Sequence, residues 1–116
     1  MKYKEDIILI LDSILDDYYL VWECFYDFNQ YRKSKERILY SFSEALKEAY
    51  ENKFLNFFEG QNFNGDEKLM PEFSLTDLEI QELLNWDNES RIEIRITTSN
   101  LGIAFLDQNR APSDNQ

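Results

Sequence analysis

The sequence predicts a single α+β domain, and three observations lead to this fold class. The chain has 116 residues, a length that suits one domain with one hydrophobic core. Apolar residues recur every three or four positions in the first half of the chain, which is typical of amphipathic helices. Residues 91–97 alternate between apolar and polar side chains, which is the period of a strand. We expect the domain to cover residues 1–106 and residues 107–116 to form a flexible tail.

Three helices are expected in the first half of the chain. The apolar spacing of residues 4–15 predicts the first helix, and that of residues 17–28 predicts the second. These two segments also fit one continuous helix, and the sequence leaves this alternative open. The polar residues 29–33 are expected to be a loop. Ser34 is placed to cap the third helix, with Arg37 already inside it.

A β-hairpin and an inserted helix are expected next. The aromatic and roughly alternating residues 54–61 favour a strand. The Asn-Gly pair at positions 64–65 is typical of a hairpin turn, because both residue types tolerate positive φ angles. Residues 67–70 would then return as a short strand. Ser74 is expected to begin the inserted helix, which covers residues 75–85.

The last expected elements are a third strand and a short C-terminal helix. Within residues 91–97, the side chains of Ile92, Ile94 and Ile96 are expected to face the core. Residues 99–106 fit either a short capped helix or one more strand, and we favour the helix.

The composition excludes several kinds of catalytic and metal site. The chain has no His, so it cannot form a Ser-His-Asp triad, a Cys-His dyad or a His-ligated zinc site. Its single cysteine, Cys24, lies among aromatic residues and is expected to be a buried, unreactive thiol. The three Gly residues are isolated and form no phosphate-binding loop. We therefore expect no enzymatic activity, no cofactor and no metal ion.

The protein is expected to be cytoplasmic and to bind no membrane. The apolar run at residues 7–11 is ended by Asp12 and is too short for a signal-peptide core or a membrane span. The lone cysteine gives no reason to expect an oxidising compartment.

The net charge of −11 is unevenly distributed along the chain. Residues 1–30 carry −5, residues 31–53 carry +2 and residues 54–116 carry −8. Affinity for nucleic-acid phosphate comes chiefly from Lys and Arg, so this balance argues against general nucleic-acid binding. An acidic surface would instead steer a basic protein into contact. The acidic residues predicted to form this partner-binding surface are Glu72, Asp77, Glu79, Glu82, Asp87 and Glu89.

The aromatic residues between positions 18 and 28 serve first as core packing in so small a domain. Those left outside the core would form an exposed anchor patch, since Tyr and Trp are favoured at interfaces. We expect Tyr19, Trp22 and Tyr26 to be the anchors of this patch.

The order of the expected elements resembles the winged helix-turn-helix plan with a helix inserted before the last strand. The third helix runs directly into the hairpin at positions 64–65, and the strand at 94–97 is followed by Ser99 and, three residues later, by Gly102. The chain also resembles small acidic bacterial winged-helix-like proteins, some of which are similar to immunity proteins of secreted toxins. This resemblance implies an immunity protein or antitoxin that binds and neutralises a basic toxin domain, such as a nuclease.

The same resemblance supports an alternative function, that of a winged-helix transcription regulator. In that plan the third helix is the recognition helix, and its N-terminal residues approach the major groove of DNA. The basic residues expected at the start of this helix are Arg32, Lys33, Lys35 and Arg37. A homo-oligomeric scaffold is a third hypothesis, and the sequence leaves the oligomeric state open.

Overall fold

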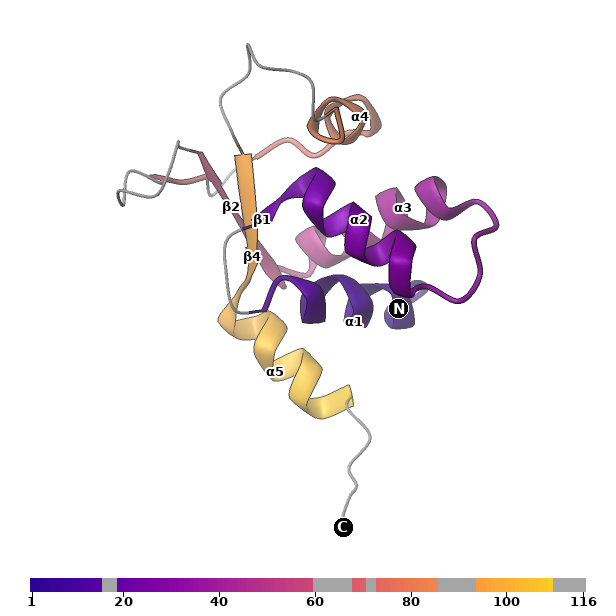
Figure 1. Cartoon of the computed structure of the whole chain (residues 1–116). Coiled ribbons are helices and arrows are strands. Elements are labelled where there is room, and N and C mark those ends of the chain that lie inside the picture. Colours follow the sequence, from indigo (N-terminus) through magenta and orange to yellow (C-terminus); the bar gives the residue numbers. More distant parts are fainter. Residues whose placement is uncertain (16–18, 60–67, 71–72, 86–93, 110–116) are drawn as a thin grey trace.

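The computed structural model describes residues 1–15, 19–59, 68–70, 73–85 and 94–109 (Figure 1). In this part of the chain, five helices and a four-stranded antiparallel sheet form an α+β fold, which confirms the predicted class. The three N-terminal helices pack together on one side of the sheet (Figure 1).

The N-terminal helices contribute one apolar face each to the core. Their bounds are α1 (Lys4–Ser13), α2 (Val21–Tyr31) and α3 (Ile38–Glu51). Helix α1 contacts both of the others. Apolar residues of all three helices are buried at helical spacing, as the sequence predicts. None of the described helices is long and apolar enough to cross a membrane.

The sheet has the strand order β1-β4-β2-β3, and neighbouring strands are antiparallel. Its strands are β1 (Tyr19–Leu20), β2 (Leu55–Glu59), β3 (Lys68–Leu69) and β4 (Ile94–Thr98). The predicted alternation is confirmed for the described part of β4, in which Ile94 and Ile96 are buried. Strands β2 and β3 pair as the predicted hairpin does, whereas the turn at positions 64–65 lies outside the described residues.

Two further helices complete the described fold, α4 (Asp77–Leu83) and α5 (Asn100–Asn109). Helix α4 buries Ile80 and Leu83 and contacts α2, while α5 follows β4 directly and contacts α1. Residues 100–106 therefore form the favoured helix and not a strand, and Ser99, which directly precedes it, accepts the N–H of Gly102. Helix α5 continues three residues into the segment predicted as a tail, and residues 110–116 lie outside the described residues.

The second helix begins later than predicted and is separate from the first. Tyr19 and Leu20 form strand β1 instead of a helical turn, because they pair with two residues of β4. The first two helices are thus not continuous. Helix α2 then extends to Tyr31, so the prediction of a loop over residues 29–33 is wrong for its first three residues.

Two of the predicted helix starts are also wrong. Arg37, which we expected inside the third helix, is its N-cap residue and has a φ of 50°. This left-handed conformation interrupts the helical path, so α3 starts one residue later. Ser34 accepts a hydrogen bond from a backbone N–H two residues later and caps only that turn. The cap of α4 is Thr76 and not Ser74, because the Thr76 hydroxyl accepts the N–H of the third helical residue.

Aromatic side chains fill the core between the helices and the sheet. The ring centroid of Phe42 in α3 lies 5.0 Å from that of Phe25 and 5.2 Å from that of Phe28, both in α2. Near the sheet, the ring of Phe57 in β2 meets that of Tyr50 edge-on at 5.2 Å. Edge-to-face contacts of this kind add to the stabilisation from burial alone.

Cys24 is fully buried in α2, which confirms the sequence prediction. Its Sγ atom lies 3.6 Å from the Oγ atom of Ser13, and burial raises the pKa of the thiol to about 12. A thiol with this pKa stays protonated at neutral pH and is a poor nucleophile.

The raised pKa of Cys24 predicts a loss of stability at alkaline pH. As the pH rises from 9.0 toward about 12, the unfolded thiol loses its proton while the folded thiol keeps it. Proton release then favours the unfolded state, so the free energy of unfolding falls. Urea unfolding over this range should show a shallower decline for Cys24→Ala than for the wild-type protein. Equal slopes for the two proteins would contradict the prediction.

Candidate functional site

Three exposed or half-buried aromatic residues gather around one surface hollow. Tyr19 comes from β1, whereas Trp22 and Tyr26 lie one turn apart at the start of α2. With Glu23 and Asp27 they line a hollow of about 270 Å³, here called the aromatic hollow. The structure thus brings together all three residues that the sequence singles out as anchors.

The aromatic hollow lies on the outward face of α2. Tyr26 is 64% exposed, whereas Cys24 and Phe28 on the inward face are 0% exposed. The aromatic residues of this segment are therefore divided between the core and the surface, as the sequence predicts. An exposed Tyr beside a Trp is a common composition of protein interfaces.

Glu23 and Asp27 give the aromatic hollow a negative charge. Glu23 is held in place because its Oε1 atom accepts the backbone N–H of Leu20 at 2.9 Å. Asp27 lies one turn further along the same helix, where two like charges repel each other weakly. Among the described residues, no Lys or Arg forms an ion pair with either carboxylate. The local negative potential is therefore not neutralised within the described fold.

Sequence reasoning missed these two carboxylates. Both lie beside the anchors at a spacing of four residues, which is the signal that places them on one helix face. The acids in and around the inserted helix are more numerous, so the sequence favours them as the partner-binding surface.

Part of the predicted acidic surface lies on α4, next to α2, the helix that carries most of the aromatic hollow. Helix α4 contacts α2, and Figure 1 shows it beside the N-terminal half of α2. It carries Asp77, Glu79 and Glu82. The other predicted members of this surface lie outside the described residues: Glu72, Asp87 and Glu89.

Asp77 takes part in an ion pair within the protein. Its Oδ1 atom lies 2.7 Å from the Nζ atom of Lys47, which also contacts Glu44 at 2.7 Å. These two carboxylates raise the pKa of Lys47 above its ordinary range. The charge of Asp77 is thus partly neutralised by Lys47. Helix α4 also carries the carboxylates of Glu79 and Glu82.

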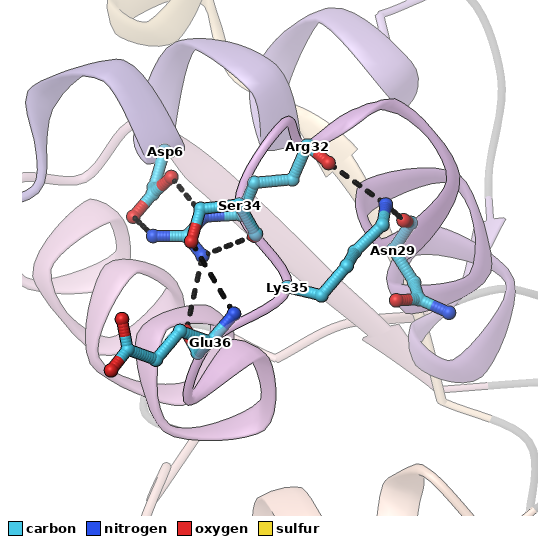
Figure 2. Close-up of polar contacts among 6 residues, drawn as sticks. All are labelled: Asp6, Asn29, Arg32, Ser34, Lys35 and Glu36. Atoms are coloured by element: carbon cyan, nitrogen blue, oxygen red, sulfur yellow. Dashed lines mark hydrogen bonds and ion pairs between the residues drawn. The ribbon is translucent and has the colours of Figure 1, made fainter.

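The predicted basic cluster forms the connection between α2 and α3 and not the first turn of a helix (Figure 2). The Nε atom of Arg32 lies 2.9 Å from the Oδ1 atom of Asp6 in α1. Its Nη1 atom donates to the backbone carbonyl of Ser34 at 2.7 Å. Arg32 therefore joins α1 to the connection, and its guanidinium is already occupied.

Two more of the basic side chains serve local contacts. The Lys35 ammonium donates to the backbone carbonyls of Asn29 and Arg32, as Figure 2 shows. The Arg37 guanidinium lies 4.3 Å from the ring centroid of Tyr40. Lys33 is exposed. The structure thus assigns most of this cluster a role in shaping the connection.

The ion pair between Arg32 and Asp6 predicts a measurable loss of stability. Both side chains are partly buried, at 20% and 16% exposure, so Arg32→Ala should lower the free energy of unfolding by about 1–3 kcal/mol. Lys33→Ala removes the same charge from an exposed position and should change it by no more than about 0.5 kcal/mol. A double-mutant cycle with Asp6→Ala isolates the pair. A coupling energy of zero would show that the contact contributes nothing.

The described residues contain no group of Asp, Glu and Cys side chains placed to hold a metal ion. The candidate site consists of the aromatic hollow, with the carboxylates of Glu23 and Asp27, and the neighbouring acidic helix α4. Comparisons with protein families, with curated proteins and with solved structures find no match to this chain.

Proposed function

We propose that the protein is a cytoplasmic immunity protein or antitoxin, which binds a basic toxin domain and neutralises it. The observation that carries the proposal is the aromatic hollow, with three aromatic side chains and two carboxylates on a chain of net charge −11. Aromatic residues act as anchors at interfaces, and the surrounding acids select a basic partner. Tyr19 also packs against the core, whereas Tyr26 is 64% exposed and is available to a partner.

Neutralisation follows from the charge of such a partner. A toxin that acts on nucleic acid presents a basic surface to the phosphate backbone. An acidic protein that covers this surface excludes the substrate. Attraction between the two surfaces also speeds their encounter, and this effect weakens as salt screens the charges.

The test is the rate of association with a basic toxin domain, sought among the products of the neighbouring genes. Replacing both Glu79 and Glu82 with Lys should slow association at low salt by about tenfold or more. The difference should shrink at high salt. Asp77 is left unchanged, because its replacement would also disrupt the ion pair with Lys47.

The matched control replaces Glu51 and Asp107 with Lys. Both residues are exposed and lie near the C-terminal ends of α3 and α5, where a basic side chain is well tolerated. This control changes the net charge by the same amount and should retain most of the association rate. If both double variants associate equally slowly, the effect comes from net charge and not from the acids of α4. If both associate as fast as the wild-type protein, acidic docking is refuted.

A winged-helix transcription regulator is the alternative proposal. Three helices followed by paired antiparallel strands are compatible with that plan, with β3 and α4 between its two longer strands. The contacts of Arg32 and Lys35 within the protein count against DNA binding by this cluster. The test is a mobility shift of DNA from the gene's own upstream region at low salt. A shift that Lys33→Ala weakens would favour the regulator, and no shift would exclude it.

A further inference from the structure

We infer that the aromatic hollow binds the guanidinium group of one arginine side chain, which the basic partner presents. The inference rests on the proposed function, because it names the chemical group by which the partner is held. It follows from the size of the hollow, its aromatic walls and its carboxylates.

The size of the hollow suits one side chain. Cavities that hold drug-sized ligands measure about 300–1,000 Å³. At about 270 Å³ the aromatic hollow falls just below that range, and it is open to solvent on the outward face of α2. A single side chain on a protein surface enters such a hollow more readily than a whole small molecule does.

The aromatic residues favour a flat cation. The faces of Trp and Tyr rings carry negative charge density and attract Arg and Lys side chains. A guanidinium is planar and weakly hydrated, so it also stacks on these rings, whereas an ammonium is a compact and strongly hydrated charge. Trp22 and Tyr26 approach from α2 and Tyr19 from β1, so the ring surfaces come from two different elements.

The carboxylates supply the hydrogen-bond acceptors. A guanidinium has five N–H donors and no acceptor, and it matches carboxylates in geometry. Glu23 uses Oε1 for the N–H of Leu20, and within the described part of the chain no hydrogen bond to its Oε2 is formed. Asp27 has no ion-pair partner among the described residues. An arginine would neutralise part of the repulsion between the two acids, which a neutral side chain would not do.

The experiment is a nuclear magnetic resonance titration with N-acetyl-arginine amide. The indole N–H signal of Trp22, assigned with Trp22→Phe, should shift in a saturable way. N-acetyl-citrulline amide, which has a similar shape without the charge, should cause no saturable shift. No saturable shift with the arginine compound, or equal shifts with both compounds, would overturn the inference.

Two pairs of variants locate the binding. Asp27→Asn should weaken binding of N-acetyl-arginine amide about fivefold or more, whereas Asp107→Asn makes the same charge change on α5 and should have no effect. Tyr26→Ala should also weaken binding, whereas Tyr31→Ala should not. Tyr26 and Tyr31 are 64% and 66% exposed on the same helix, so neither truncation disturbs the core. Equal affinities within each pair would overturn the inference.

This result and the result for the proposed function can be told apart. Suppose that N-acetyl-arginine amide fails to bind, while replacing Glu79 and Glu82 still slows association with the basic protein. The inference about the aromatic hollow then fails, and the proposed function stands. If the arginine compound binds as expected but no basic protein associates, the hollow is a guanidinium site and the proposed function fails.

Discussion

Replacing Phe42 with Ala should lower the free energy of unfolding by about 3–5 kcal/mol. The side chain is 0% exposed and contacts the rings of Phe25 and Phe28, so its removal leaves a cavity between α2 and α3. This is a large part of the stability of a domain of this size, which is typically about 5–15 kcal/mol. Urea denaturation followed by circular dichroism measures the change.

Leu39→Ala is the control for Phe42→Ala. Leu39 lies on the same helix and is 44% exposed, so its truncation should cost about 1 kcal/mol or less. Comparable losses of unfolding free energy in the two variants would contradict the buried position of Phe42 in the core.

Gly102→Ala should lower the free energy of unfolding by about 1–3 kcal/mol, although it adds only one methyl group. The new Cβ atom would lie 2.2 Å from the carbonyl oxygen of Phe54 and 2.6 Å from Cγ2 of Thr98. Neither group can move freely. The Phe54 carbonyl accepts the N–H of Ser99 at 2.9 Å, and the Thr98 hydroxyl donates to the carbonyl of Leu11 at 2.7 Å.

A second substitution makes the Gly102 prediction specific. Thr98→Ser removes Cγ2 but keeps the hydroxyl, so it should cost less in the Gly102→Ala background than in the wild-type protein. Gln108→Ala adds no atoms at an exposed position of α5 and should change the stability by no more than about 0.5 kcal/mol. If the effects of Gly102→Ala and Thr98→Ser on the free energy of unfolding are fully additive, this result argues against a close approach between α5 and β4.

The regular elements were largely predictable because their signals are local. The apolar spacing of α1 and α3 and the alternation of Ile94 and Ile96 each follow from one short stretch of sequence. Strand β1 has no such signal, since two residues are too few to establish a period. Tyr19 and Leu20 become a strand only because β4, far along the chain, lies beside them.

The candidate site was also predictable only where its residues are brought together by local structure. Helical spacing places Trp22 and Tyr26 on one face of α2, but Tyr19 joins them only through the pairing of β1 with β4. The basic cluster shows the reverse situation. A sequence run suggests free cations, whereas Arg32 meets Asp6, a residue 26 positions away that no local pattern connects to it.

The shortness of β1 has a consequence for the local motion of the aromatic hollow. A strand of two residues has little pairing to hold it, so it is expected to open without unfolding the rest of the protein. The aromatic hollow takes Tyr19 from this strand and its other walls from α2, so a bound ligand would bridge the two. Binding would then suppress this local opening. Slower amide hydrogen exchange at residues 19–20 would reveal an occupied site even where the average structure does not change.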